Sequence, residues 1–472
     1  MKHLQLGLTL REGALTLGAA SLSILNFPPF GLWPLSLPAI CLFLLLLRDR
    51  DSARARSLGL LYGLAYGLGT MYWFFNIFSV LAIPLIAIFA AYFGILATLV
   101  SLSKDHRPLV RAALVGLFAA GVEWLRGDAW YLRFPWYTVP HALAQDPIWI
   151  APVRWLGTYG FSFALWFIAG LGAFAHYWYW ALFALVPASA LLLPDFPSPD
   201  QKALLLQSEQ IGGADNLIRT EALGSKRKID LVVLPEYAYR SAPARVLASR
   251  YGPAVLARKY RCPVVFGATE ENADRTNYYN VAAVSDAEGD LLGTFAKQHP
   301  VPLFRDGIPG DRRPVFPVAG GVLGVAACYD FDAPEIAASL VHRGATVLVD
   351  PTFDAMSWGR IQHEHHELLV RLRAVENDRW VLRCASSGRS EAVDPHGFPS
   401  AAGVAIGRAG SVVADYAHAE EGSYPLGGQL HILGPVAAAG CLVYLVVFWV
   451  RRRPEKTQTV ERNLDPAGGG KG

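Results

Sequence analysis

Ile229-Asp230-Leu231-Val232-Val233-Leu234-Pro235-Glu236 is a short apolar run that ends in a carboxylate. A run of this length, bounded by turn residues, is typical of a buried strand. Two more runs have the same form, because Leu291–Ala296 is followed by Lys297 and Gly321–Ala327 is followed by Cys328. Since α/β proteins place functional groups at the ends of strands, we expect these three side chains to meet in one cleft. A carboxylate, an ammonium and a thiol are the groups needed to form and use a thioester.

Apolar runs recur between Pro194 and Gly428 and alternate with helical patterns, which predicts an α/β domain. A unit of roughly 235 residues is large enough to bury a core of its own. The proline-rich segment Pro194–Asp200 is expected to link it to the preceding part of the chain. The expected strands are Ala203–Gln207, Ile229–Leu234, Pro263–Ala268, Tyr278–Ser285, Leu291–Ala296, Gly321–Ala327, Ala345–Val349 and Trp380–Ser386. The expected helices are Ala244–Tyr260 (broken at Gly252-Pro253), Pro334–Arg343 and Gln362–Asn377.

The remainder of the chain predicts a helical membrane domain. Hydrophobic residues make up 53% of the sequence and charged residues 17%, which is too apolar for an ordinary soluble protein. Charge-poor stretches close to the ~20 residues that span a bilayer indicate eight spans. We place them at Ala14–Phe30, Pro34–Leu47, Leu58–Phe78, Val80–Ser103, Leu109–Trp124, Thr158–His176, Trp178–Leu193 and His431–Val450.

Basic residues in the short loops predict the orientation, since positive loops stay on the cytoplasmic side. Such residues lie between spans two and three, between spans four and five, and after span eight at Arg451–Arg453. Both termini are therefore expected in the cytoplasm and Pro194–Gly428 outside. The expected division is 1–193 for seven spans, 194–428 for the α/β domain, 429–450 for the eighth span, and 451–472 for a basic, then disordered, cytoplasmic tail.

Cysteine usage and charge exclude some classes of function. Three of the five cysteines, Cys262, Cys328 and Cys384, lie in the expected outer segment, and an odd number leaves at least one thiol unpaired. No spacing indicates a zinc site, and neither a metal nor another cofactor is expected. The formal net charge of +3 gives no reason to expect a nucleic-acid partner.

The thiol of Cys328 needs activation, because an ordinary cysteine has a pKa near ~8.5 and is mostly protonated at neutral pH. Glu236 is the candidate base, and Lys297 can stabilise first the thiolate and then an oxyanion. The backbone N–H of Tyr329 is a second candidate donor to that oxyanion. Taken singly, each residue can also be incidental, since a lone cysteine after two alanines is usually a small core residue.

Leu234-Pro235-Glu236, Lys297 and Cys328-Tyr329-Asp330 together resemble the Glu-Lys-Cys triad of the nitrilase, or carbon–nitrogen hydrolase, superfamily. This resemblance implies an αββα sandwich. With its flanking spans, the chain is similar to one branch, the apolipoprotein N-acyltransferases. Further segments similar to that branch are Asn26–Pro34, Gly121–Arg126, Phe134-Pro135-Trp136, Tyr279-Asn280 and Arg373–Arg379.

The chain departs from that family in three places. The usual Pro-Phe-Gly-Glu after the lysine is replaced by Pro302–Asp306, so Asp306 is the expected substitute for a second carboxylate. Asp330 stands where the family usually has Glu. The segment Asp350–Gly359 replaces an Asn-Asp…Trp-Phe-Gly motif. We expect Phe304 and Trp358 to line the substrate site.

The resemblance implies acyl transfer from a membrane phospholipid, through a thioester on Cys328, to the N-terminal amine of a diacylglyceryl-cysteine in an apolipoprotein. The expected partners are the phospholipid donor, the diacylated apolipoprotein and membrane lipids. The protein is expected to be a monomer in the bacterial inner membrane with its catalytic domain on the periplasmic face. Two alternatives stay open: a membrane-tethered amidase or nitrilase for a small C–N substrate, and a catalytically silent scaffold that binds lipoproteins.

Two other clusters invite interpretation. His363-Glu364-His365-His366-Glu367 lacks the His-Glu-x-x-His zinc pattern, and we expect a solvated or cleft-rim helix face, with a substrate contact or a metal as alternatives. An aromatic cluster is expected to anchor the chain at headgroup level, and some members to line a lipid entrance. Its members are Trp124, Trp130, Tyr131, Trp136, Tyr137, Trp149 and Trp155.

Overall fold

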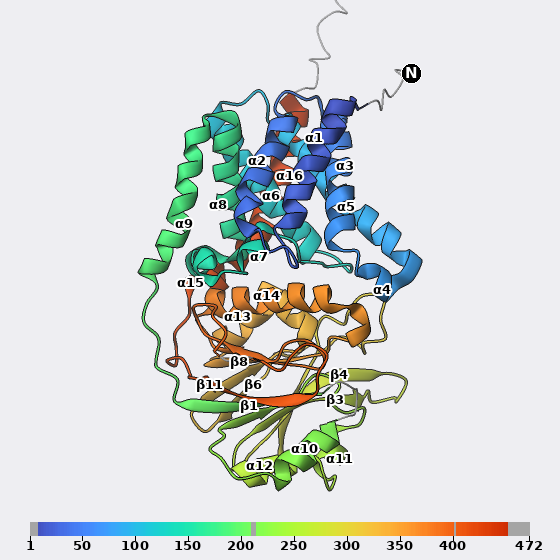
Figure 1. The fold of residues 1–472 in the computed structure, drawn as a ribbon, viewed down its shortest axis with the longest axis vertical. Helices are drawn as coiled ribbons and strands as arrows, with labels where there is room; N and C mark the ends of the chain where they lie inside the picture. The colour runs from blue at the N-terminus through green and yellow to red at the C-terminus, as the bar shows by residue number, and fades with distance from the viewer. Residues whose placement is uncertain (1–7, 209–213, 401–402, 452–472) are drawn as a thin grey trace, which may run out of the picture.

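The computed structural model describes residues 8–208, 214–400 and 403–451. A bundle of apolar helices forms one end of the molecule and two stacked β-sheets form the other (Figure 1). Helix α14 (Arg360–Asn377) lies across the region where the two parts meet (Figure 1). The predicted combination of a helical membrane domain with an α/β domain is therefore confirmed.

The α/β domain contains two sheets. The first has the strand order β11-β1-β2-β3-β4-β5 and the second β10-β9-β8-β7-β6. In the first sheet the strands are β1 Gln201–Gln207, β2 Leu231–Val233, β3 Val264–Glu271, β4 Tyr278–Ser285, β5 Leu291–Ala296 and β11 Gly410–Tyr416. In the second they are β6 Val315–Val318, β7 Gly321–Val325, β8 Val347–Thr352, β9 Val381–Ala385 and β10 Glu391–Val393. Strands β1, β2 and β3 run parallel, and so do β7, β8 and β9.

Both faces of the central strands are buried, which explains their continuous apolar sequence. In β1, Leu204 and Leu206 pack in a cluster with α10 (Ala214–Leu223) and α12 (Ala254–Tyr260). Ala203 and Leu205 instead pack in the cluster shared with the second sheet. A further cluster joins the second sheet to α13 (Pro334–His342) and α14. The layers are thus helices, sheet, sheet and helices, which is the expected αββα sandwich.

All eight expected strands are present, β4 and β5 with the predicted ends and the other six with shifted ends, but β6, β10 and β11 were not predicted. Strand β6 contains Pro317 and lies at the edge of its sheet, where a proline is tolerated. Strand β10, at the other edge of that sheet, is only three residues long, and β11, at an edge of the first sheet, is only partly buried. The expected break at Gly252-Pro253 is present, between α11 (Pro243–Leu247) and α12. Helix α10 was not predicted either.

Helices of the membrane domain differ in length and apolarity. They are α1 Leu10–Leu25, α2 Ser36–Leu47, α3 Ser52–Thr70, α4 Phe74–Phe78, α5 Ala82–Leu102, α6 Pro108–Gly127, α7 Val139–Leu143, α8 Val153–Phe174, α9 Leu185–Ala188, α15 Leu426–Gln429 and α16 Leu433–Arg451. In the part of the chain that the structure describes, four stretches are long and apolar enough to cross a membrane: Phe74–Leu102, Pro108–Gly127, Val153–Phe174 and Leu426–Arg451. Trp33–Leu47 and Tyr177–Leu192 are shorter apolar helices. The division into eight spans stays a prediction.

One expected span boundary was wrong. Phe74–Phe78, placed at the end of span three, instead opens the long helical stretch that continues into α5. Helix α3 already ends at Thr70 after Gly67 and Gly69, and glycine is among the weakest helix formers. This shift matters because α4 and α5 form one wall of the site described below.

Close packing against α3 fixes the position of α5. A Cβ atom added to Gly59 would lie 2.4 Å from the carbonyl oxygen of Phe93, and one added to Gly63 would lie 2.7 Å from Cα of Ala90. Small residues spaced four apart let membrane helices approach until their backbones touch. The wall formed by α5 is therefore held by backbone packing.

Candidate active site

Glu236, Lys297 and Cys328 come together at one end of the sandwich. Glu236 follows β2 and Cys328 follows β7, and Lys297 follows β5. The backbone N–H of Lys297 donates to the carbonyl of Asn280 at 2.8 Å, so the pairing of β5 with β4 continues up to the lysine. Glu236, Lys297 and Cys328 are 3%, 1% and 4% exposed, so the surrounding protein, more than solvent, sets their chemistry.

The ammonium of Lys297 lies between two carboxylates. Its Nζ is 2.8 Å from Oε1 of Glu236 and 2.8 Å from Oδ2 of Asp306. Nδ2 of Asn280 donates to the same two carboxylates, at 2.6 Å to Glu236 and 2.8 Å to Asp306. The hydroxyl of Tyr237 donates to Asp306 at 2.7 Å. Asp306 therefore occupies the place expected for the second carboxylate.

This arrangement separates the roles of the charged groups. Burial raises the pKa of Glu236, and the neighbouring Asp306 raises it further against the opposing effect of Lys297. Burial alone would lower the pKa of Lys297, but Asp306 and Glu236 outweigh it and hold the pKa well above its ordinary value. Burial would raise the pKa of Asp306, but Lys297 outweighs it and the pKa is lowered. Glu236 is thus the carboxylate suited to accept a proton.

Cys328 sits on a strained turn that starts directly after β7. Its φ is +52°, a left-handed conformation that costs a non-glycine residue roughly 1–2 kcal/mol. The Cys328 backbone N–H donates to Oδ1 of Asp350 at 3.0 Å, which helps hold the turn. Burial, followed by the charge of Glu236, raises the pKa of the thiol well above its ordinary value. The thiol therefore rests protonated, and a thiolate forms as its proton moves to a base.

The segment after β8 contacts both Cys328 and Glu236. The backbone N–H of Phe353 donates to Oε2 of Glu236 at 2.9 Å, and Sγ of Cys328 lies 3.8 Å from the carbonyl oxygen of Phe353. This segment, which includes Asp350, belongs to the part of the sequence that departs from the related family. Its backbone nevertheless contacts both the carboxylate of Glu236 and the sulfur of Cys328.

Asp330 joins the nucleophile turn to the chain that follows Lys297. The backbone N–H groups of Gln298 and His299 donate to its carboxylate at 2.9 and 2.8 Å. Burial raises the pKa of Asp330 to about 7. The hydroxyl of Tyr329 donates to the carbonyl of Arg133, in the membrane-domain loop before α7. The contribution of the Tyr329 amide to an oxyanion hole stays a prediction.

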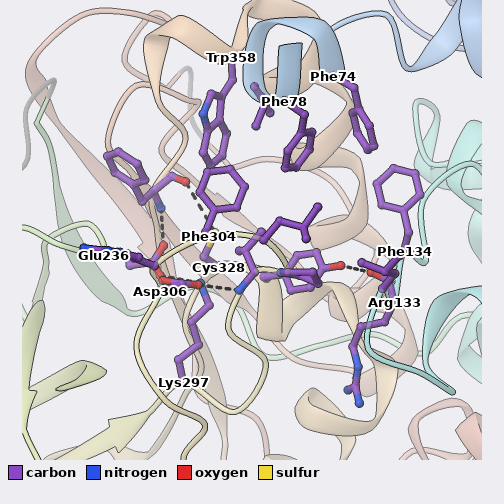
Figure 2. A pocket seen from close by; sticks show the side chains of 18 of the residues that line it. Phe74, Phe78, Arg133, Phe134, Glu236, Lys297, Phe304, Asp306, Cys328 and Trp358 are labelled. Atoms are coloured by element: carbon purple, nitrogen blue, oxygen red, sulfur yellow. Dashed lines mark hydrogen bonds and ion pairs between the residues drawn. The ribbon is translucent and has the colours of Figure 1, made fainter. Parts of the chain in front are cut away.

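A cavity of about 890 Å³ extends from these residues to the membrane helices. Figure 2 shows Glu236, Lys297 and Asp306 beside Cys328, with aromatic side chains on the side of the membrane helices. The apolar lining from α4 and α5 comprises Phe74, Ile77, Phe78, Leu85, Ile88 and Phe89. Phe304 and Trp358 also line the cavity, and the Phe304 ring centroid is 5.5 Å from that of Phe78 and 5.8 Å from that of Trp358. The cavity thus has a reactive polar end and an apolar end.

The expectation of a solvated histidine face was wrong. His363, His365 and His366 are all buried, because α14 packs between the second sheet and the membrane domain. His366 does line the cavity, which fits the cleft-rim part of the interpretation. Within the described residues no group of three or more His, Cys, Asp or Glu side chains is placed to hold a metal ion.

Some members of the aromatic cluster are buried inside the protein and so are not exposed anchors. Trp136 and Tyr137 are 3% exposed and belong to the core, and the indole of Trp136 contacts the α/β domain. Trp130 and Tyr131 are exposed, as anchors would be. All five cysteines are unpaired, so the prediction that at least one of Cys262, Cys328 and Cys384 is a free thiol is confirmed.

The sequence alone did not reveal the roles of Asn280, Asp350 and Arg383. Asn280 was noted only as similar to a family segment, yet it bridges both carboxylates of the site. Arg383 holds Asp350 at 3.0 Å and is itself buried. The available signal was a polar or charged residue inside or at the end of an apolar strand, since such a group is buried only when it has partners.

A sandwich with this Glu–Lys–Cys arrangement defines a carbon–nitrogen hydrolase, and the family model with the description "Carbon-nitrogen hydrolase" matches residues 200–423. A second model, described as "Apolipoprotein N-acyltransferase N-terminal domain", matches residues 19–171. The chain therefore belongs to the apolipoprotein N-acyltransferase family, the membrane-embedded branch of the nitrilase superfamily.

Curated relatives agree over most of the chain. It is 26% identical to the apolipoprotein N-acyltransferase of Pseudomonas aeruginosa over 452 residues, covering 81% of this chain and 86% of that protein. It is 26% identical to that of Azotobacter vinelandii over 453 residues, covering 81% and 85%. Among solved structures, Nit3 of Saccharomyces cerevisiae, a member of branch 10 of the nitrilase superfamily, is 22% identical with a TM-score of 0.40, covering 48% of this chain and 92% of that chain.

Proposed function

We propose that the protein transfers an acyl chain from a membrane phospholipid, through a thioester on Cys328, to the N-terminal amine of a diacylglyceryl-cysteine in apolipoproteins. One observation carries the proposal: a single cavity joins Cys328 to apolar side chains of the membrane helices α4 and α5. An acyl chain can lie along that apolar lining with its ester at the thiol. The chain is a membrane protein, so phospholipid is available at this wall.

In the first half-reaction, Glu236 takes the proton from Sγ of Cys328 as the sulfur attacks the ester carbonyl. The negative charge that develops on the carbonyl oxygen is stabilised by the Lys297 ammonium. When the C–O bond breaks, Glu236 returns the proton to the leaving oxygen, and lysophospholipid departs. The acyl chain remains on Cys328 as a thioester, with its tail against the apolar lining.

In the second half-reaction, the α-amine of the diacylated lipoprotein attacks the thioester carbonyl. Glu236 accepts the proton that the amine loses and passes it to the departing sulfur, which restores the thiol. The product is an amide. A buried site excludes water, which would otherwise hydrolyse the thioester.

The cavity favours this function over the two alternatives. Binding of a small C–N substrate does not require an apolar lining supplied by membrane helices. A catalytically silent scaffold does not require a buried, charge-balanced Glu–Lys–Asp cluster beside a cysteine. The basic loops support a location in the bacterial inner membrane, with the catalytic domain on the periplasmic face. We propose that the protein acts there as a monomer.

The test uses the purified full-length protein in mixed micelles of phospholipid and detergent, with a synthetic diacylated lipopeptide as acceptor. We expect the lipopeptide mass to rise by one acyl group and lysophospholipid to accumulate in equal amount. A lipopeptide with an acetylated N-terminus is the matched control and should not react. Hydrolysis of small amides without acylation of the lipopeptide would favour the amidase alternative, and no reaction of either kind would favour the scaffold.

A separate prediction concerns Asp306. We expect Asp306→Asn to slow thioester formation by about 10- to 100-fold, because loss of this charge lowers the pKa of Glu236 and weakens it as a base. Asp306→Glu keeps the charge and should lose less. Asp311→Asn is the control, since Asp311 is highly exposed and pairs only with Arg312 at 3.9 Å among the described residues. The measurement is the rate of acyl-enzyme formation after mixing with phospholipid, and equal rates for Asp306→Asn and Asp311→Asn would contradict the role of Asp306.

A further inference from the structure

His366 on α14 lies between two buried carboxylates. Its Nδ1 is 2.8 Å from Oδ1 of Asp354, and its Nε2 is 3.2 Å from Oδ1 of Asp332. A carboxylate can only accept hydrogen bonds, so Nδ1 is best protonated as the donor to Asp354. Nε2 lies within ion-pair distance of Asp332 but makes no hydrogen bond to it. The negative charge beside each ring nitrogen favours protonation of both. The side chain is therefore placed as an imidazolium.

Arg383 is the neighbour that could donate a hydrogen bond to Nδ1 of His366 and so favour an unprotonated Nδ1. Its Nη2 lies 3.1 Å from Nδ1 of His366, and a guanidinium can only donate. If Nδ1 accepted from Arg383, its lone pair would face Asp354 at the shorter distance of 2.8 Å. Arg383 Nη2 already donates to Oδ2 of Asp354, also at 2.8 Å, so it has a partner without the histidine. The balance of charge also favours a protonated His366, because three buried carboxylates (Asp332, Asp350 and Asp354) surround one guanidinium and one imidazole.

The cluster holds both ends of the nucleophile turn. Asp332 is the last residue of the short 3-10 helix that begins at Cys328. At the other end, the Cys328 N–H donates to Asp350, and Arg383 Nη1 donates to the second oxygen of Asp350 at 3.0 Å. His366 completes this frame, because it is the group that contacts both Asp332 and Asp354. Its loss would remove the link between Asp332 and Asp354 and leave Asp332 held by Trp136 and by Arg373.

The same histidine contacts the membrane domain. Trp136, in the loop between α6 and α7, stacks on the His366 ring with centroids 5.2 Å apart and an interplanar angle of 26°. The Trp136 indole N–H donates to Oδ2 of Asp332 at 2.7 Å. Trp136 is itself anchored by Arg126 at the end of α6, whose Nη2 donates to its carbonyl at 2.6 Å.

We propose that His366 is a positioning residue that, together with Trp136, couples the membrane-domain loop between α6 and α7 to the geometry of the Cys328 turn. The loop reaches the turn through the indole–Asp332 contact and through the ring stack on His366. Correct seating of the membrane domain thus sets the direction of Sγ in the cavity. This inference rests on the proposed role of Cys328 as the nucleophile.

The test measures alkylation of Cys328 by iodoacetamide in the full-length protein, followed by peptide mass spectrometry, which needs neither phospholipid nor lipoprotein. We expect His366→Gln and Trp136→Phe each to slow alkylation by about 10- to 100-fold, because small displacements of a reacting atom have effects of this size. The double variant should be no slower than the slower single variant, because both act through Asp332. Full alkylation rates in both single variants, or additive losses in the double variant, would overturn the coupling.

A pH series separates the imidazolium from a packing role. Burial would lower the pKa of His366, but Asp354 and Asp332 outweigh burial and the charge of Arg383 and raise it to about 9. His141 of α7 is another titratable group nearby, and burial lowers its pKa to about 3, so it stays neutral throughout this range. A histidine with a raised pKa stabilises the fold below its ordinary value of ~6.5 and loses that contribution as pH rises through about 9.

We therefore expect the difference in melting temperature between wild type and His366→Gln to be large at about pH 6.5 and to shrink by about pH 10. His365→Gln is the matched control on the same helix turn, because burial lowers the pKa of His365 to about 4 and its charge does not change in this range. Its difference from wild type should not depend on pH. A pH-independent difference for His366→Gln would overturn the imidazolium assignment, and normal acyl transfer with slow alkylation would overturn its link to catalysis. Failure of lipopeptide acylation with unchanged alkylation behaviour would count against the proposed function alone.

Discussion

Cys328→Ala should transfer no acyl chain to a diacylated lipopeptide, with a fall of about 10⁴-fold or more in rate. Losses of this size follow removal of a covalent nucleophile, because the remaining groups have no atom to carry the intermediate. Mass spectrometry of the peptide that contains residue 328 should detect the acyl adduct in wild type after incubation with phospholipid. The same peptide of Cys328→Ala should stay unmodified.

Cys262→Ala is the control for this experiment. Cys262 is an unpaired, buried cysteine of the same domain, but it packs in the cluster of the outer helix layer, away from the cavity lining. Its replacement should leave the adduct and the transfer rate close to wild type. Acylation of the lipopeptide by Cys328→Ala at a wild-type rate would show that the thioester mechanism is wrong.

Lys297→Met should reduce acyl transfer by about 10²- to 10³-fold, since the only ammonium beside the thiol among the described cavity-lining residues is lost as an oxyanion stabiliser. The same change should lower the free energy of unfolding by about 3–5 kcal/mol, because it leaves two buried carboxylates without their counter-ion. Glu236 and Asp306 would then repel each other within the site. Transfer rates and thermal unfolding of the purified protein measure the two effects.

Lys202→Met is the matched control for stability. Lys202 pairs with Asp415 at 2.5 Å, but the two side chains are 45% and 58% exposed, and an exposed pair contributes about 1 kcal/mol or less. Adding Asp306→Asn to Lys297→Met should restore part of the lost stability without restoring activity, because it removes one unpaired charge. Equal effects of Lys297→Met and Lys202→Met would mean that the cluster around Lys297 is not charge-balanced as described.

The buried cluster also explains why the altered segment Asp350–Gly359 is compatible with an intact site. Asp350 contacts Cys328 through the backbone of the cysteine, and Phe353 contacts Glu236 through its own backbone N–H. The Phe353 contact tolerates changes in the side chains of the segment because it uses the segment's backbone, whereas the Asp350 contact requires its carboxylate. Trp358, from the same segment, lines the cavity. A change of side chain there alters the shape of the cavity and leaves the reactive groups in place.

The central strands of the α/β domain could be predicted from the sequence because each buries both faces and so appears as a short, continuous apolar run. Edge strands such as β6 and β11 were not, since a half-exposed strand with a proline or alternating polar residues has a weak pattern. The expectation that the histidine face of α14 is solvated was wrong for a related reason. Polar residues on a helix usually mark a solvated surface, and the packing of α14 between two domains cannot be read from the helix itself.

The sequence by itself determined the class of fold, the order of Glu236, Lys297 and Cys328 at strand ends, and the presence of a membrane domain, because these depend on local hydrophobic pattern and residue chemistry. Only the tertiary structure decided which partners surround them. Asn280 and Asp306 meet Lys297, and His366, Asp332 and Trp136 meet near Cys328, from segments far apart in the chain. Such contacts arise from the way the sheets and the membrane domain pack, and burial then makes each unpaired charge costly enough that the partners must be present.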